Sequence, residues 1–267
     1  MLLAISSPLE DDMTGSREKD LLATANLLMD ARRTGHRLTD LPKGLRPVNA
    51  EEVDAIQDMM ARGYGDIGGW KIGATTPEAT PSFCPMPADW IGSSGSLLSG
   101  ERWNYRVVEA EIAFLVGEDL PPRATAYSRE EVLAAVASCH PAIEVLETAF
   151  VDPTAVAPNS MLADLQRNGG FFYGAAFADW KKTDFNAERV TLAVDGSVRV
   201  ERTGSNTSGD LLRLLPWLAS EGAARTGGLR AGQWVTTGSW TGNTPAFAGA
   251  DVDVEFSTAG RVSVRFA

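Results

Sequence analysis

The stretch VVEAEIAFLVG, residues 107–117, places two glutamates in a run that otherwise consists of residues suited to burial. If residues 107–116 form a strand, Glu109 and Glu111 project from the same face about 6.5 to 7 Å apart, because side chains alternate along a strand with a period of two. An unpaired carboxylate in an apolar setting costs several kcal/mol. The two acids therefore either share a cation or lie on a strand face that is open to solvent.

A third acid, Glu144, lies in HPAIEVLE, residues 140–147, which is again an apolar run typical of a strand. Three carboxylates without a well-placed His or Cys suit Mg²⁺ or Mn²⁺ better than Zn²⁺, because the first two ions prefer oxygen ligands. Spacing alone does not separate this metal site from an edge strand with alternating acids exposed to water.

Composition narrows the classes of function. The chain has 267 residues, of which 44% are hydrophobic and 22% charged, and this is typical of a folded globular protein. The net charge of −11 and the lack of clustered Lys and Arg argue against nucleic-acid binding. Two cysteines without metal-type spacing, no basic signal at the start and no long apolar window lead us to expect a cytoplasmic protein without a membrane anchor.

Hydrophobic periodicity predicts a helical start and a mainly β body, an α+β fold. Helices are expected at 16–33, 50–62, 128–138 and 208–223, and the domain division is a helical segment over 1–65 followed by a catalytic domain over 66–267. Strands are expected at 67–73, 107–116, 142–148, 170–177, 189–194, 197–202, 233–238, 251–256 and 261–266. Residues 76–106 carry several prolines and little periodicity, so they are expected to form a long loop, a lid or binding loop rather than a disordered insertion.

Four segments in order carry a family resemblance: GWKIGATT (69–76), VVEAEIAFLVGEDLP (107–121), HPAIEVLE (140–147) and GLRAGQWVTTGSWTG (228–242). Together they resemble the 2-keto-4-pentenoate hydratase and 4-oxalocrotonate decarboxylase group of the fumarylacetoacetate hydrolase superfamily. The resemblance implies a distorted β-roll with an N-terminal helical cap, a metal held by Glu109, Glu111 and Glu144, a small 2-oxo acid as substrate, and a homo-oligomer.

The same resemblance suggests catalytic residues. Lys71 in GWKIG matches a lysine that the family places in its site, where a cation stabilises enolate charge. The alternative for Lys71 is a strand lysine whose head reaches solvent. Asp89 in PADW falls near the place where the hydratases carry an acid, and it is a candidate general base if the long loop folds over the pocket.

The chain departs from the family pattern at two places. The usual Asp-Asn-Ala-Ser-Ser-Gly is replaced by DLQRNG at 164–169, and the usual Asp-Ser-Arg by ETAF at 147–150. Arg167 and Asn168 are therefore expected to contact the substrate and to set its specificity. In the family reading, Ser239 and Thr241 of GSWTG border the substrate carboxylate, and a plain β-turn is the alternative.

The resemblance favours a metal-dependent hydratase of aromatic or related catabolism that adds water to a 2-hydroxy-2,4-dienoate. Two alternatives keep the same metal site: decarboxylation of a 2-oxo-3-enedioate, with Arg167 holding the distal carboxylate, and carbon–carbon bond hydrolysis in an acylpyruvate. A further alternative is a relative that binds a ligand without catalysis, which the altered 164–169 segment would explain.

Overall fold

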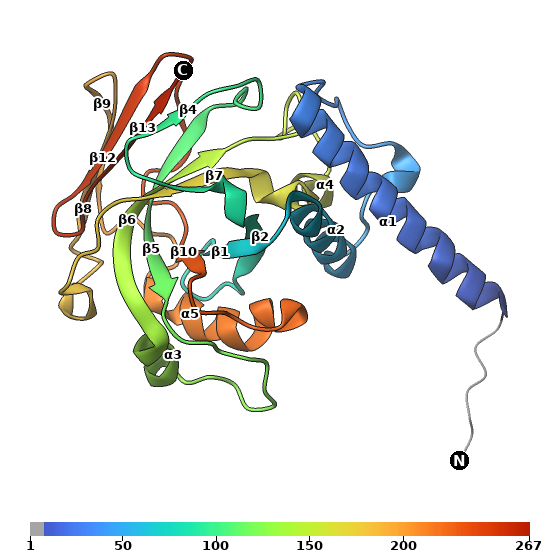
Figure 1. Cartoon of the computed structure of the whole chain (residues 1–267), viewed down its shortest axis with the longest axis horizontal. Coiled ribbons are helices and arrows are strands. Elements are labelled where there is room, and N and C mark those ends of the chain that lie inside the picture. Colours follow the sequence, from blue (N-terminus) through green and yellow to red (C-terminus); the bar gives the residue numbers. More distant parts are fainter. Residues whose placement is uncertain (1–7) are drawn as a thin grey trace.

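The glutamate-bearing run forms strand β5 (Val107–Val116) in the computed structural model, which describes residues 8–267. Both faces of β5 are covered, since nine of its ten residues are buried. It pairs antiparallel along its whole length with β6 (Val136–Leu146), as Figure 1 shows at the centre of the molecule. Val108, Ala110 and Ile112 point into the main core, so Glu109 and Glu111 must point to the opposite face.

β5 and β6 belong to an eight-stranded sheet in which most neighbours are antiparallel. In spatial order this sheet contains β2 (Ser82–Pro87), β1 (Ile67–Gly73), β10 (Trp234–Thr236), β5, β6, β7 (Asn168–Tyr173) and β3 (Ile91–Ser93), with β11 (Thr244–Pro245) also paired to β5. β1 and β10 are parallel, and their register sets Lys71 beside Thr236. Strands from both halves of the chain thereby meet next to β5.

A second, five-stranded sheet packs on the face of β5 that carries Val108, Ala110 and Ile112. Its strands in spatial order are β4 (Ser96–Leu98), β13 (Gly260–Phe266), β12 (Asp251–Phe256), β8 (Arg189–Val194) and β9 (Ser197–Thr203), at the left of Figure 1. Alternate residues of β8 and β12 are buried and fill the space between the sheets with the main hydrophobic core. This core fixes the face on which the glutamates lie.

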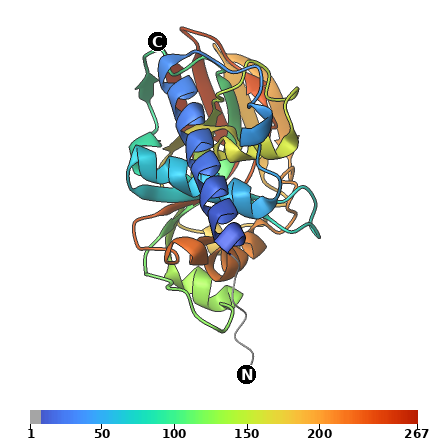
Figure 2. The ribbon, with the colours of Figure 1, turned by 90° about the vertical axis from the view of Figure 1, so that its right-hand side faces the viewer.

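Helices cover the opposite side and the lower end of the large sheet (Figures 1 and 2). The α-helices are α1 (Pro8–Thr34), α2 (Ala50–Tyr64), α3 (Arg129–Ala135), α4 (Pro158–Ala163) and α5 (Leu214–Trp217). Shorter 3₁₀ and π turns are Lys43–Leu45, Ala88–Trp90, Leu165–Arg167, Trp180–Lys182, Leu211–Arg213, Leu218–Gly222 and Ala223–Thr226. α1 and α2 share a second hydrophobic cluster with Phe150 and Leu165, which anchors the helical segment beside the glutamate-bearing end of β6.

The structure confirms the α+β class and the N-terminal helices, but it contradicts the predicted long loop at 76–106. That segment contains β2, β3 and β4, and β2 pairs with β1 through all of its length. Four of the six β2 residues are buried although two of the six are prolines, because β2 is an edge strand, where a missing amide is tolerated. The division into 1–65 and 66–267 stays a prediction.

The helix expected at 128–138 ends at Ala135, and the chain enters β6 directly at Val136. Val136 pairs with Val116 of β5, so strand pairing overrides the helix propensity of the alanines before it. None of the helices in the described residues is both long enough and apolar enough to cross a membrane.

Candidate metal centre and active site

The three glutamates named from the sequence lie together on one face of the large sheet. Glu109 stands directly opposite Glu144 in the β5–β6 pairing, and Glu111 follows two residues along β5. One carboxylate oxygen from each residue lies within 4.8 Å of the other two. Glu111 and Glu144 have no exposed surface and Glu109 is 8% exposed, so the open strand face considered from the sequence is excluded.

Lys71 of β1 joins this cluster. Its Nζ lies 2.9 Å from both carboxylate oxygens of Glu144 and is aligned for a hydrogen bond with Oε1. Burial alone would lower the pKa of Lys71, but the charges of Glu144, Glu109 and Glu111 outweigh it and raise the pKa above its ordinary value. Lys71 is therefore a mostly buried cation among carboxylates, with 14% of its side chain exposed, and its ammonium contacts Glu144 rather than extending into solvent.

The remaining contacts leave two carboxylate oxygens without an aligned hydrogen-bond donor, although one of them, Glu144 Oε2, keeps its ion pair with Lys71. Glu111 Oε2 accepts hydrogen bonds from Thr236 Oγ1 and, at 3.1 Å, from the Gly238 amide. Glu144 Oε1 also accepts from Asn168 Nδ2 at 2.7 Å. Glu111 Oε1 and Glu144 Oε2 are buried and accept no hydrogen bond from the described residues.

These orphaned oxygens make the cluster a good fit for a divalent cation. Burial, and after it the charges of Glu144 and Glu109, raise the pKa of Glu111 well above its ordinary value. Burial also raises the pKa of Glu109, against the opposing effect of Lys71. Three carboxylates opposed by one lysine leave an excess of negative charge, which a hard cation with oxygen ligands would neutralise.

A strained turn covers the cluster from the side of β7. Leu165, Gln166 and Arg167 have φ angles of 47°, 49° and 66°, three successive left-handed residues without a glycine. Such a conformation costs roughly 1–2 kcal/mol per residue, and strain of this kind gathers at functional sites. The turn is held by a hydrogen bond from Gln166 Nε2 to the Phe83 carbonyl at 2.7 Å, and the Gln166 carbonyl lies 3.4 Å from Lys71 Nζ.

The turn brings Arg167 and Asn168 to the glutamates, and their contact with a substrate stays a prediction. Asn168 contacts Glu144 directly. Arg167 reaches the cluster through Asn243: with the amide oriented to satisfy its neighbours, Asn243 donates to Glu109 Oε1 at 2.8 Å and accepts from Arg167 Nη1 at 3.3 Å. The Arg167 side chain forms no ion pair among the described residues, so its charge is free for an anionic ligand.

The two residues of the GSWTG turn that were expected at the site, Ser239 and Thr241, have different positions. Ser239 lies near enough to Glu109 to oppose the rise of the Glu109 pKa, and its Oγ accepts a hydrogen bond from the Gly242 amide at 2.8 Å. Thr241 is buried, accepts a hydrogen bond from the Ala110 amide at 3.0 Å and donates to the Gly242 carbonyl at 3.3 Å. Ser239 thus borders the cluster, whereas the Thr241 hydroxyl ties the turn to β5.

The structure does not bring Asp89 to the cluster. Asp89 is exposed in the turn Ala88–Trp90 after β2. Lys71 pairs with Cys84 in the middle of β2, and Asp89 follows five residues later, beyond the end of that strand. Asp89 was expected to act as a base only if residues 76–106 formed a loop over the pocket. The residues before Asp89 form the edge strand β2 instead, so that condition is not met.

Three further residues at the cluster, Thr236, Gln166 and Asn243, were not predicted from the sequence. Asn243 comes directly after GSWTG, so extending that motif by one residue would have included it. Thr236 shares a face of β10 with Trp234, and only the β1–β10 and β10–β5 pairings show that it faces Glu111. Gln166 approaches Lys71 through its carbonyl, for which the residue type carries no signal.

Comparison with known proteins agrees with this fold. The model of the fumarylacetoacetate (FAA) hydrolase C-terminal family matches residues 70–267. The chain is 25% identical over 256 residues to 2-keto-4-pentenoate hydratase 2 of Dechloromonas aromatica (strain RCB), covering 92% of this chain and 97% of that protein. It is 28% identical over 176 residues to a 4-oxalocrotonate decarboxylase of a Pseudomonas species, covering 65% of each.

Among solved structures, the chain is similar to 4-oxalocrotonate decarboxylase from Pseudomonas putida G7 complexed with magnesium and adipate. The two share a TM-score of 0.81 at 22% sequence identity, with 93% of this chain and 98% of the other covered. At that identity the similarity establishes the fold, and it confirms the predicted β-roll with an N-terminal helical cap.

Proposed function

The chain belongs to the fumarylacetoacetate hydrolase family, and from that premise we propose that it is a metal-dependent hydratase that adds water to a 2-hydroxy-2,4-dienoate. The observation that carries the proposal is the buried cluster of Glu109, Glu111 and Glu144 with Lys71 in contact. A protein without a ligand for this site would bear the cost of three buried carboxylates for no gain. A sequence relative that is aligned over nearly its whole length is a hydratase, which supports this reaction.

We propose that Glu109, Glu111 and Glu144 hold Mg²⁺ or Mn²⁺. A divalent ion held there would supply Lewis-acid stabilisation for negative charge on the substrate's carboxylate and 2-oxygen. The similar structure with magnesium supports the first of these ions. The homo-oligomeric state and the cytoplasmic location expected from the sequence stay part of the proposal.

Lys71 supplies the second positive charge. As an ammonium beside Glu144 it donates a hydrogen bond to the oxygen on which enolate charge develops when the dienol becomes the α,β-unsaturated ketone. Water then adds at C4 of that ketone. Because Lys71 is held in place by Glu144 and the Gln166 carbonyl, it needs no reorganisation when the charge appears.

A second candidate, decarboxylation of a 2-oxo-3-enedioate, is favoured by Arg167. Its guanidinium is free of carboxylate partners among the described residues and its Nε is buried without an acceptor. A guanidinium matches a carboxylate in a bidentate fork, so Arg167 would hold the distal carboxylate of a dicarboxylic substrate. Stabilisation of the same enolate by Lys71 would then favour loss of CO₂.

Product analysis by NMR tests the proposal. Purified protein with Mg²⁺ is incubated with 2-hydroxypentadienoate and, separately, with its dicarboxylate analogue, each with an EDTA control. A 4-hydroxy-2-oxo acid that forms from the first substrate only without EDTA supports the hydratase. CO₂ release from only the second identifies a decarboxylase, and no reaction with either contradicts both and turns the search to acylpyruvates.

The Glu109→Gln variant separates metal-dependent turnover from a contaminating activity. We expect it to lose both Mg²⁺ binding and turnover, because the substitution removes one of three anionic ligands. Glu201→Gln, on the exposed strand β9, is the matched control and should behave as the parent. Full activity of Glu109→Gln would contradict the assignment of Glu109 as a metal ligand that turnover requires.

A further inference from the structure

A cavity of about 330 Å³ lies beside α1, on the other side of the strained turn from the glutamates. Its walls include Arg32, Arg37, Tyr64, Trp90, Arg102 and Glu147, and none of the metal-site residues. Its volume is at the lower end of the range of about 300–1,000 Å³ that small-molecule sites occupy. We call this space the arginine cavity.

The arginine cavity has more positive than negative charge. Arg32 forms an ion pair with Asp164, which does not line the cavity, at 2.5 Å between Nε and Oδ1. Arg102 forms no ion pair among the described residues. Burial, and after it the neighbouring Arg32, lower the pKa of Arg102, as expected for a cation that lacks a counter-charge.

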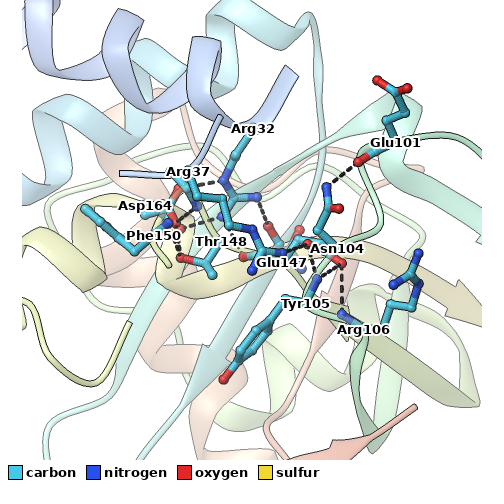
Figure 3. A network of polar contacts seen from close by, with 12 residues as sticks. Arg32, Arg37, Glu101, Asn104, Tyr105, Arg106, Glu147, Thr148, Phe150 and Asp164 are labelled. Atoms are coloured by element: carbon cyan, nitrogen blue, oxygen red, sulfur yellow. Dashed lines mark hydrogen bonds and ion pairs between the residues drawn. The ribbon is translucent and has the colours of Figure 1, made fainter. Parts of the chain in front are cut away.

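The carboxylate in the wall, Glu147, balances only part of this charge, through an ion pair with Arg37. Glu147 accepts hydrogen bonds from the backbone amides of Tyr105 at 2.9 Å and Arg106 at 3.0 Å, and Figure 3 shows these contacts. Its distance to Arg37 Nη2 is 3.6 Å, too long for a hydrogen bond. Arg37 Nη2 is buried and has no acceptor in the described part of the chain, so one further acceptor is needed there.

The remaining wall is aromatic. The rings of Tyr64 and Trp90 lie 4.6 Å apart between centroids, and Arg102 lies over the Trp90 ring at 5.0 Å. The Tyr64 hydroxyl is buried without a hydrogen-bond partner in the described residues. Such a wall suits a flat apolar group. Arg102 Nη2 already donates to the Gly169 carbonyl, so the groups that still need an oxygen acceptor are Arg37 Nη2 and the Tyr64 hydroxyl, while the Arg102 guanidinium adds a positive charge without a carboxylate partner.

We propose that the arginine cavity binds a small organic carboxylate with a planar, apolar body, that is, an aromatic acid. The carboxylate lies between Arg37 and Arg102, and the ring packs against Trp90 and Tyr64. This is a second ligand site, because the turn 164–168 separates the cavity from the metal centre. Arg32 donates to the carbonyls of Asp164 at 2.8 Å and Asn168 at 2.7 Å, whereas the Asn168 side chain turns to Glu144.

Isothermal titration with benzoate tests the site, with cyclohexanecarboxylate and inorganic phosphate as comparison probes. The titrations use the full chain treated with EDTA, so that binding to a metal ion is removed. We expect saturable benzoate binding that is tighter than that of either comparison probe. Arg102→Gln and Arg37→Gln should each weaken it at least tenfold, and the matched control Arg199→Gln, on exposed β9, should leave it unchanged.

Circular dichroism melts of each variant show that it is folded before it is titrated. Three results would overturn the proposal: benzoate binding that disappears on EDTA treatment, which would assign it to the metal centre; equal affinity of the parent and both arginine variants; and no binding at millimolar benzoate. Phosphate binding tighter than benzoate would also overturn it, because the aromatic wall would then have no role.

Discussion

Arg32 of α1 and Asp164 at the end of α4 form a buried ion pair, 2.5 Å between Nε and Oδ1, that fastens the N-terminal helix to the turn beside the glutamates (Figure 3). The same guanidinium donates to the carbonyls of Glu147, Asp164 and Asn168, so all three nitrogens of Arg32 have acceptors. Asp164 Oδ2 accepts from Thr148 and from the Ala149 amide, both at 2.8 Å. The pair thus links α1, the end of β6 and the strained turn.

Removing Arg32 should strongly destabilise the protein. Arg32→Gln leaves Asp164 as a buried charge without its cation, and breaking a buried pair in this way costs about 3–5 kcal/mol. Urea denaturation measures the loss. Arg33→Gln is the matched control, because Arg33 and its partner Asp30 are exposed and such pairs contribute about 0–1 kcal/mol. Equal midpoints for the two variants would contradict the role of the pair.

Without metal, the protein should lose stability as the pH rises. The pKa of Glu109 and that of Glu111 are raised in the fold above their ordinary value of 4.5. Above that pH the folded state holds protons that the unfolded state has released, so the free energy of unfolding falls. Glu52, whose pKa is lowered, titrates below this range. His140, whose pKa burial lowers from 6.5, opposes the trend only up to about that pH, and it is one group against two.

Thermal melts of EDTA-treated protein between about pH 5 and about pH 8 check this sign, because the linkage relation predicts a falling Tm there. Added Mg²⁺ should remove most of the fall, since it neutralises the carboxylates that repel each other. Glu111→Gln should flatten the profile in EDTA. A Tm that rises with pH in the metal-free parent would show that the cluster is not strained by its charge.

Lys71→Met should separate catalysis from metal binding. We expect kcat to fall by about 10²–10³-fold, the usual effect of losing one donor to a developing oxyanion. Affinity for Mg²⁺, measured by titration calorimetry, should stay or increase, because the glutamates lose their only competing cation in contact. Lys43→Met, at an exposed position, is the control. A kcat within twofold of the parent would remove Lys71 from the chemistry.

Arg167 offers a paired test of strain and specificity. Arg167→Ala and Arg167→Gly both remove the guanidinium, but only glycine adopts the φ of 66° without steric cost. The glycine variant should therefore be more stable than the alanine variant by up to about 1 kcal/mol in urea denaturation. If Arg167 holds a distal carboxylate, both variants lose preference for a dicarboxylic substrate equally. Unchanged preference in both would exclude that role.

Residue pattern alone singled out the three glutamates as candidates, because strand alternation and the apolar flanks of Glu109, Glu111 and Glu144 are local properties. The helical start and most strands of the body were predictable for the same reason. The family resemblance was needed to favour a metal site over an exposed strand face. It also added Lys71, whose own strand gives no sign that it faces Glu144.

What the sequence could not show depends on pairings between distant segments. Two prolines in Ser82–Pro87 suggested a loop, but the edge position next to β1 tolerates them. The distance of Asp89 from GATT in the sequence suggested that it lies in the site. Because the intervening residues form the edge strand β2, Asp89 lies beyond the end of that strand and away from the glutamates. The left-handed turn at 165–167 contains no glycine, so the sequence gives no sign of it. It is stabilised by the hydrogen bond from Gln166 to the Phe83 carbonyl and by the one from Arg32 to the Asn168 carbonyl.

The parallel pairing of β1 with β10 also bears on how the chain folds. Residues 69–71 find their partners only at 234–236, so β1 gains this neighbour and Glu111 its Thr236 contact late in synthesis. Non-local pairings of this kind slow folding. A nascent chain that ends before Trp234 would expose the edges of β1 and β5, surfaces on which other chains can pair. The protein should therefore depend on chaperone protection during translation more than a helical protein of similar length, and ribosome-bound intermediates should resist proteolysis only once β10 has emerged.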